Sequence, residues 1–212
     1  ECSNGLEEDA CGVCGGDNST CPTITDIDGN VYATVEIGSQ NWMKQNLKVT
    51  HYNDGSEIPT GLDNSAWNTT EEGAYAIHDD DPANAEIYGN LYNWYAVDDE
   101  RGLCIEGWHI PSDAEWTILT DFLGGSSISG GKMKTIGTIE NGNGLWFAPN
   151  TGATNESGFS GIPGSDRGHS NGAYDAVGYN GIFWSSLSSI QNEDNAWIRK
   201  LDYNQSETIR DN

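Results

Sequence analysis

The apolar residues in the second half of the chain come in short pieces separated by glycine-, serine- and asparagine-rich turns. The clearest pieces lie at 145–147, 158–159, 182–184 and 196–198, and the chain holds 27 glycines in all. Pieces this short and this regularly interrupted are typical of small strands joined by long loops. They argue against a βαβ fold, in which long helical segments alternate with the strands.

Turn signals nearer the N-terminus predict hairpins. An Asp-Gly pair at 28–29 stands between β-branched and alternating apolar residues, and Asn-Asp-Gly at 53–55 is a second tight turn. Residues 24–48 therefore read as strand, turn, strand, turn and strand. The polar stretch at 59–88 is expected to be irregular. The aromatic run at 88–97 is expected to form a buried strand or a short helix.

One helix is clearly predicted, beginning after Ser112. Ser112 and Glu115 have the spacing of a capping box, in which each side chain satisfies a backbone N–H of the other residue. An apolar stripe follows the cap, and two glycines at 124–125 end the helix. The stripe consists of Ile118, Leu119, Phe122 and Leu123.

The charge of the chain excludes several classes of partner. Its 212 residues include 33 acidic and 9 basic ones, which gives a net charge of −24. Such a surface repels phosphate backbones, so we expect no nucleic-acid partner. Anionic membranes are disfavoured for the same reason. No apolar stretch is long enough to predict a membrane span.

Four of the five cysteines crowd into the first 21 residues: Cys2, Cys11, Cys14 and Cys21. The C-x-x-C spacing at 11–14 would suit a zinc knuckle, but the neighbours are acidic and almost none is apolar. Two disulfides of undetermined connectivity are therefore favoured, which indicates an oxidising compartment and a secreted or cell-surface location. We expect residues 1–22 to form a cysteine-rich stalk or spacer and 23–212 a separate domain, with Cys104 left over.

Seven motifs carry a resemblance to a known family: IGSQNWMKQNLK, YNDGSEI, YGNLYNWYAV, GLCIEGWHIPSDAEWTIL, SGFSGIPGSDR, GYNGIFWSS and AWIRKLDYN. Their order and spacing closely resemble the Fibrobacter succinogenes major paralogous domain over about residues 24–210. The resemblance implies a bacterial exported or surface protein with a C-type-lectin-like fold. The expected class is therefore α+β, with small twisted antiparallel sheets, one clear helix and long loops. The first 22 residues resemble cysteine-rich segments of surface proteins.

The chain departs from the family's pattern at its C-terminal end. Family domains usually continue into a final strand of the GFSVRC type, whose cysteine would be the natural partner of Cys104. The resemblance thus implies that 23–212 lacks its last strand, which is missing, lies outside this chain, or comes from another subunit. Formylglycine-generating enzymes share the implied fold and a similar helix entry, but they need a late cysteine pair that this chain lacks.

No catalytic motif stands out. The chain contains no G-x-S-x-G, no H-E-x-x-H and no phosphate-binding glycine loop, so we expect no enzyme activity. The histidines are scattered; His109 is expected to be structural and His169 to lie in a loop. The family itself has no established activity, which leaves binding as the leading interpretation.

The late loops are the predicted binding surface, because Tyr, Ser and Asn combine contact area with adaptable hydrogen bonding. Trp184 and Trp197 are expected in the core, and Arg167 could instead be an internal ion pair. The candidate ligand-binding residues are Asp166, Arg167, His169, Asn192, Asp194, Tyr203 and Asn204.

Calcium is the one cofactor that the sequence suggests, because acidic loops supply the oxygen ligands that it prefers. Neither acidic loop completes an EF-hand, and each could be an ordinary turn or a solvated loop tip. The triplet at 148–150 lacks the acidic residue of the calcium-dependent sugar site of C-type lectins. The candidate calcium ligands are Asp26, Asp28, Asp79, Asp80 and Asp81.

The leading hypothesis is a non-catalytic extracellular ligand-binding or adhesion module of a bacterial surface protein, whose partner is a carbohydrate or a surface protein. A second hypothesis is a structural subunit that self-associates into an extracellular fibre or surface assembly. It is suggested by the expected missing strand, by Cys104 and by the cysteine-rich segment. A third, disfavoured hypothesis is an oxidase of the formylglycine-enzyme type.

Overall fold

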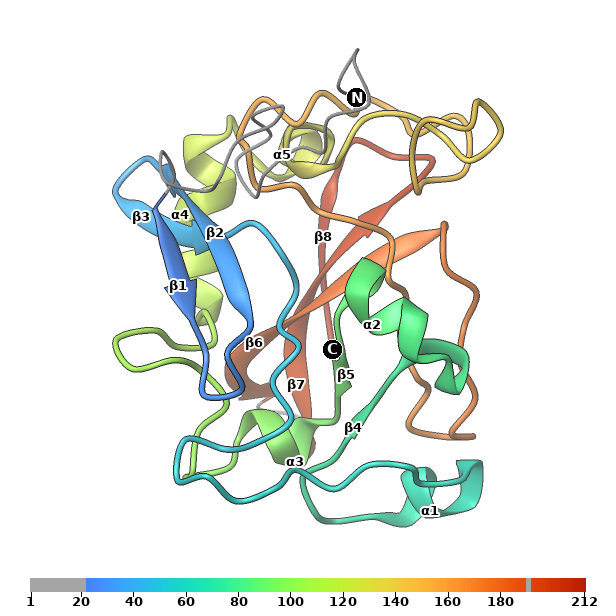
Figure 1. The fold of residues 1–212 in the computed structure, drawn as a ribbon. Helices are drawn as coiled ribbons and strands as arrows, with labels where there is room; N and C mark the ends of the chain where they lie inside the picture. The colour runs from blue at the N-terminus through green and yellow to red at the C-terminus, as the bar shows by residue number, and fades with distance from the viewer. Residues whose placement is uncertain (1–21, 190–191) are drawn as a thin grey trace.

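The computed structural model describes residues 22–189 and 192–212. The cysteines of the predicted disulfides and nearly all of the predicted stalk lie outside these residues. The described chain forms three small antiparallel sheets with short helices and long loops around them (Figure 1). This confirms the predicted α+β class. None of the helices in the described ranges is both long and apolar enough to cross a bilayer.

The N-terminal sheet contains the predicted succession of strands: β1 (Thr23–Thr25), β2 (Val31–Ile37) and β3 (Gln40–Met43). The Asp26 carboxylate closes the first turn, since Oδ1 accepts the amide hydrogens of Asp28 at 3.0 Å and of Asn30 at 2.9 Å. Gly29 supplies the positive φ of 86° that this turn requires. The hairpin prediction is confirmed.

The middle of the chain is more regular than predicted. The stretch expected to be irregular holds α1 (Asn64–Thr69), β4 (Tyr75–Ala76), the 3₁₀ helix η1 (His78–Asp80) and α2 (Pro82–Tyr88). Side chains of Asp63 and Asp81 cap α1 and α2. These helices span too few turns to show an apolar stripe. The aromatic run contains both predicted elements, β5 (Leu91–Tyr92) and α3 (Trp94–Val97).

The predicted helix is α4 (Asp113–Phe122), and its capping box is present. Ser112 Oγ accepts the Glu115 amide hydrogen at 3.2 Å, and Glu115 Oε2 accepts that of Ser112 at 2.8 Å. The expected stripe is only half right. Leu119 and Leu123 are buried, but Ile118 and Phe122 are 50% and 63% exposed. The buried face instead includes a tryptophan one turn earlier, Trp116.

Replacing Ser112 by alanine is expected to lower the free energy of unfolding by about 1 kcal/mol, because the first turn of α4 loses its cap. Urea denaturation followed by circular dichroism measures the change. Ser127→Ala, at an exposed position inside the next helix, is the matched control and should leave stability unchanged or slightly raised. Equal effects of the two substitutions would contradict a specific role for the cap.

A second helix, α5 (Ser126–Met133), follows directly and was not predicted. Its sequence, SSISGGKM, has no apolar stripe, because the helix packs its small residues against backbone. A Cβ added at Gly130 would overlap the Glu207 carbonyl group, which belongs to the segment leading into the last strand. The close approach therefore depends on glycine, a residue that sequence propensity reads as helix-breaking.

The C-terminal sheet has the order β6 (Asn180–Ser189), β7 (Asn192–Asp202) and β8 (Thr208–Asp211). The apolar pieces at 182–184 and 196–198 form its strands as predicted, whereas those at 145–147 and 158–159 lie in loops. The expected closing strand belongs next to β6 and β7. Beside β7 that position is taken by β8, so a strand donated by another subunit would have to pair with an outer edge.

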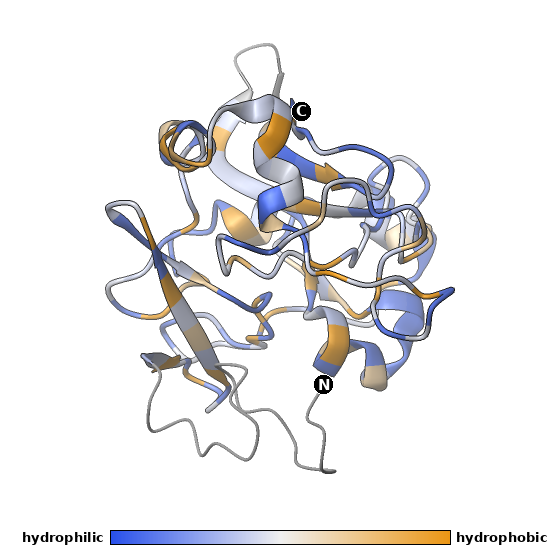
Figure 2. Cartoon of the chain, turned by 90° about the horizontal axis from the view of Figure 1, so that it is seen from above, coloured by the Kyte–Doolittle hydropathy of each residue, from blue (hydrophilic) through white to orange (hydrophobic). Residues whose placement is uncertain are grey.

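The main core is aromatic and lies between the N-terminal sheet, α4 and the C-terminal sheet. The Trp42 and Trp116 rings are 4.8 Å apart between centroids, and Phe159 and Phe183 are 5.5 Å apart. Trp146, from a loop, is fully buried in the same cluster. Figure 2 shows the hydrophobic residues as short stretches distributed over many elements, which agrees with the interrupted apolar pattern of the sequence.

Candidate ligand-binding cleft

A cleft of about 560 Å³ lies where the N-terminal and C-terminal sheets face each other. Five stretches line it, from 39–47, 88–92, 103–111, 159–165 and 181–184. These stretches are far apart in sequence and converge on the middle of the molecule, between β3, β5 and β6 (Figure 1). The fold thus builds the cleft from loops and strand ends held by the aromatic core.

Two half-buried tryptophans, Trp108 and Trp184, contribute aromatic surface to the cleft. Trp184 is fixed in place because its Nε1–H donates to the Tyr92 carbonyl at 2.9 Å. Trp184 and Trp197 were expected in the core, and both are only partly covered. The ring of Trp197 packs under the guanidinium of Arg210, 3.4 Å from its centroid.

The cleft walls contain polar side chains whose hydrogen-bonding capacity is not fully used. Among the described residues, buried polar atoms without a partner include four from cleft-lining residues: Gln40 Oε1, Trp42 Nε1, Asn90 Oδ1 and Ser165 Oγ. A buried donor or acceptor without a partner costs about 1–3 kcal/mol, and native proteins contain few of them. Their concentration in one cleft is the arrangement expected of a site that completes its hydrogen bonds with a bound molecule.

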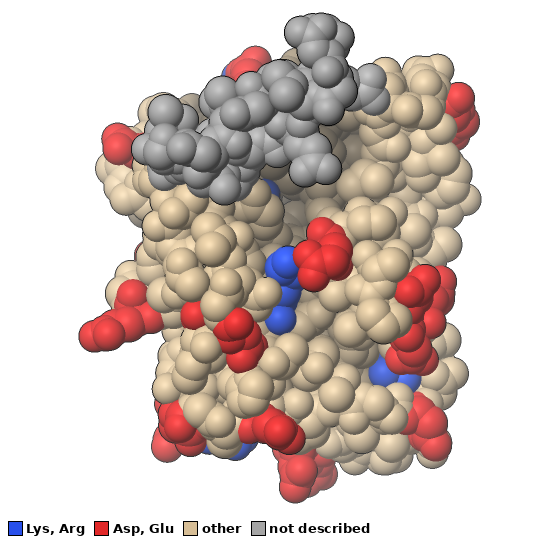
Figure 3. Space-filling model, viewed as in Figure 1, with Lys and Arg blue, Asp and Glu red and all other residues tan. Residues whose placement is uncertain are grey.

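Lys44 gives the cleft a positive charge. It is half-buried, and it is the one basic residue whose side chain has no hydrogen bond, ion pair or ring contact among the described residues. The other basic side chains have carboxylate or backbone partners. Figure 3 shows how few basic side chains lie among the acidic ones on one face of the molecule.

The titratable groups on the rim are already engaged. His109 Nε2 lies 2.8 Å from Glu115 Oε1, although the histidine ring is exposed. Burial alone would raise the pKa of Glu115, but hydrogen bonds from Ser112 and His109 outweigh it and lower the pKa below its usual value. Burial raises the pKa of the Cys104 thiol to about 11. That thiol stays protonated at neutral pH, and a protonated thiol is a poor nucleophile.

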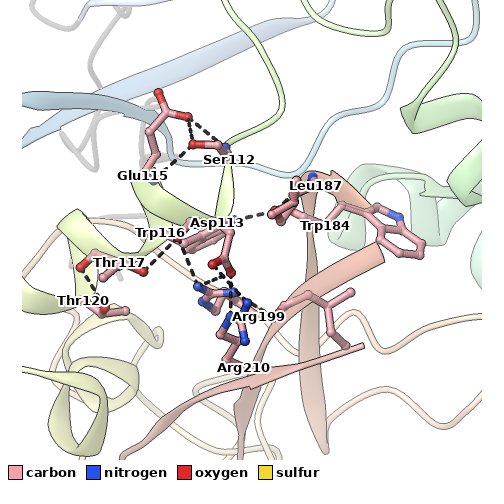
Figure 4. A network of polar contacts seen from close by, with 12 residues as sticks. Ser112, Asp113, Glu115, Trp116, Thr117, Thr120, Trp184, Leu187, Arg199 and Arg210 are labelled. Carbon is pink, nitrogen blue, oxygen red and sulfur yellow. Dashed lines mark hydrogen bonds and ion pairs between the residues drawn. The ribbon is translucent and has the colours of Figure 1, made fainter. Parts of the chain in front are cut away.

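A polar network beside the cleft holds α4 against the C-terminal sheet (Figure 4). Asp113 Oδ1 accepts from Arg199 Nη2 and from Arg210 Nε, each at 2.8 Å. The two arginines are direct cross-strand partners on β7 and β8. Trp116 adds a second link, since its Nε1–H donates to the Trp184 carbonyl at 3.1 Å. The network thereby fixes the two aromatic walls relative to each other.

The predicted ligand-binding residues at 166–169 lie away from this cleft. Arg167 is buried and holds loops together, since it donates to the carbonyls of Gly172 and Leu62 at 2.8 Å and stacks on two rings. Its partners are thus carbonyl groups and rings; no ion pair with a described residue forms. Burial, with the nearby Asp175, raises the pKa of half-buried Asp166. His169 is exposed.

The remaining predicted ligand contacts belong to another region. Tyr203 packs edge-to-face on Tyr179, with the centroids 5.4 Å apart, and Asn204 is exposed. Asn192 and Asp194 lie on β7, in a part whose side chains are outside the described structure. The contacts of Arg167 and Tyr203 are with different parts of the chain, so the structure does not gather the predicted set into one pocket.

The candidate calcium ligands are engaged in hydrogen bonds within the chain. Asp26 accepts from its own turn and from the Tyr32 hydroxyl at 2.6 Å, and Asp28 accepts from Thr50. Within 22–189 and 192–212, no three or more histidine, cysteine or carboxylate side chains are placed to hold a metal ion.

The second acidic loop is used in three different ways. Asp79 lies 3.4 Å from His78 Nδ1, Asp80 accepts from the Tyr174 hydroxyl at 2.7 Å, and Asp81 caps α2. Calcium binding at either loop therefore stays a prediction.

Sequence reasoning missed the cleft residues themselves. Gln40, Trp42 and Lys44 alternate along β3 and just beyond it, so they lie on one side of the strand. That alternation was a readable signal of a polar strand face. Asn90 and Ser165 carried none, because only the folded chain brings them to the cleft.

A family model described as the Fibrobacter succinogenes major domain matches residues 35–211. The match includes every stretch that lines the cleft. Searches of curated proteins and of solved structures found no match.

Proposed function

This chain belongs to the Fibrobacter succinogenes major domain family, and from that premise we propose that it is a non-catalytic ligand-binding module of a bacterial surface protein. We place its ligand in the cleft between the two sheets. The observation that carries this proposal is the set of unpartnered polar atoms in cleft-lining residues.

The size and composition of the cleft support binding of a small molecule or of one end of a polymer. Ligand sites commonly enclose about 300–1,000 Å³ and combine aromatic walls with a few polar groups. This cleft, at about 560 Å³, combines the half-buried rings of Trp108 and Trp184 with amide, hydroxyl and ammonium groups. Binding there would satisfy polar groups that the chain itself leaves without partners.

The titratable groups of the cleft support binding over catalysis. General acid–base catalysis needs a group free to exchange a proton with the substrate. Glu115 is held by Ser112 and His109, and burial keeps the Cys104 thiol protonated. The exported location rests on the N-terminal cysteines, the acidic composition and the family.

A substitution at the mouth of the cleft tests the proposal. Asn41 is exposed on β3 and lines the cleft, so tryptophan there is expected to obstruct the cleft without disturbing the core. The experiment measures thermal stabilisation of the protein by a panel of neutral oligosaccharides, acidic oligosaccharides and short peptides. Asn41→Trp is expected to lose about 1 kcal/mol or more of binding free energy for any compound that stabilises the wild type.

Ile136→Trp is the matched control, because that side chain is 63% exposed and does not line the cleft. It should bind as the wild type does. A ligand that binds Asn41→Trp as tightly as the wild type would place binding elsewhere, in the late loops for example. Failure of the whole panel to stabilise the wild type would count against a binding module of this kind.

A further inference from the structure

We propose that the ligand of the cleft is a carbohydrate bearing a single carboxylate, which pairs with Lys44. This inference rests on the proposed function and specifies the chemistry of its ligand. Three observations carry it: the lack of a partner for Lys44, the strongly acidic chain around it, and the kinds of polar atoms that lie near it in the cleft walls.

The state of Lys44 is unusual for this protein. Acidic residues outnumber basic ones by 33 to 9, and even so the Lys44 ammonium has no acidic partner within the described residues. Eight other basic side chains are engaged, several of them on the open surface. A half-buried ammonium without a partner is costly unless a bound group supplies the opposite charge.

The position of Lys44 is fixed by the strand before it. Its amide donates to the Ala33 carbonyl at 2.9 Å, which continues the pairing of β3 with β2. Gln40, two alternations earlier, is also held, since its Nε2 donates to the Glu115 carbonyl at 3.1 Å. The strand therefore presents an unpartnered amide oxygen, an indole N–H and an ammonium in a row along the cleft.

One lysine in a highly acidic protein favours one negative charge on the ligand. With a net charge of −24, the protein repels a polyanion such as a nucleic acid or a polyphosphate. A single carboxylate gains a local charge-assisted hydrogen bond from Lys44 and has little long-range repulsion to overcome. This is why we assign an acidic sugar unit and exclude a polymer charged at every residue.

The unpartnered atoms favour hydroxyl groups as their partners. Gln40 Oε1 and Asn90 Oδ1 accept, Trp42 Nε1 donates, and Ser165 Oγ does either. A sugar hydroxyl both donates and accepts, so a polyhydroxylated ring can answer such a mixed set. The aromatic surface of Trp108 and Trp184 suits the apolar faces of sugar rings.

Calorimetric titration with two matched probes tests this inference. One is an oligosaccharide ending in glucuronic acid, and the other is the same oligosaccharide ending in glucose. The wild type is expected to bind the acidic probe about tenfold or more tightly, since hydrogen bonds to charged groups contribute about 1.5–3 kcal/mol. Lys44→Met keeps the aliphatic stem and should abolish this preference, with little change for the neutral probe.

Lys132→Met is the matched control, since Lys132 pairs with Glu156 outside the cleft, and it should keep the preference. Equal affinity of the wild type for both probes would overturn the carboxylate assignment and leave the proposed function standing. So would the absence of binding by either probe when another compound of the panel binds in the cleft. Tighter binding of a short peptide carboxylate than of the acidic sugar would overturn the carbohydrate assignment.

Discussion

Replacing Lys134 by methionine is expected to lower the free energy of unfolding by about 3 kcal/mol, because two buried carbonyl groups lose their donor. Lys134 is fully buried, and its ammonium donates to the carbonyls of Asp202 at 2.7 Å and Gln205 at 2.8 Å. It also lies 5.3 Å from the ring centroid of Trp146. The ammonium thus holds the turn between β7 and β8 against the core.

The effect of Lys134 also depends on pH. Burial lowers the pKa of Lys134 to about 8, whereas an unfolded lysine titrates near 10.4. Between these values the unfolded chain binds more protons, so the contribution of Lys134 to stability rises as the pH rises, by up to about 1.4 kcal/mol per pH unit. The difference in stability between wild type and variant should therefore widen from pH 8 to pH 10.

Urea denaturation of both proteins at pH 7 and pH 9.5 measures this. Lys132→Met, which removes only a surface ion pair, is the control and should change stability by less than about 1 kcal/mol. A stability of Lys134→Met within that margin would show that the carbonyl groups find other partners.

Replacing Asp113 by asparagine is expected to lower the free energy of unfolding by about 3 kcal/mol at neutral pH. Arg199 has a side chain only 4% exposed, and without Asp113 its charge stays buried without a carboxylate. The substitution also leaves Arg199 and Arg210 as like charges on directly opposite residues, which destabilises a strand pair. Unlike the case of Lys134, this loss separates α4 from the sheet.

The acid sensitivity of the protein should change in the same variant. Burial would raise the pKa of Asp113, but the hydrogen bonds and charges of Arg210 and Arg199 outweigh it and lower the pKa. The stabilisation is therefore complete above the unfolded pKa near 3.9 and is lost as the pH falls through the lower folded value. The wild type and Asp113→Asn should thus converge in stability below about pH 4.

Denaturation curves between pH 7 and pH 3 check this, with Asp121→Asn as the matched control. Asp121 is exposed on the same helix, so its loss should change stability by less than about 0.5 kcal/mol. If the gap between wild type and Asp113→Asn stayed constant down to pH 3, the ion pair would not be its source.

The parts of the fold that could be predicted depend on local interactions. The capping box of α4 and the turn at Asp26 are made by residues two to four positions apart, so the sequence shows them directly. The family was found in the same way, from the order of short motifs. The helix α5 could not be predicted, because it exists by fitting glycines against the backbone of a distant segment.

The candidate site was predicted least well, for a physical reason. The late loops are rich in residues that often bind ligands, but Arg167 and Tyr203 use those groups to hold the fold together. The cleft instead gains its character from what Lys44, Asn90 and Ser165 lack. A missing partner is a property of the folded arrangement, which composition and spacing cannot reveal.

The opposed arginines of β7 and β8 have a consequence for the order in which the chain assembles. The hairpin of these strands places two positive charges opposite each other, and only Asp113 of α4 neutralises them. A ribosome delivers α4 before either strand, so the compensating carboxylate is present when the hairpin emerges. A circular permutant that begins at β6 would reverse this order, and its hairpin would wait unneutralised until α4 was made.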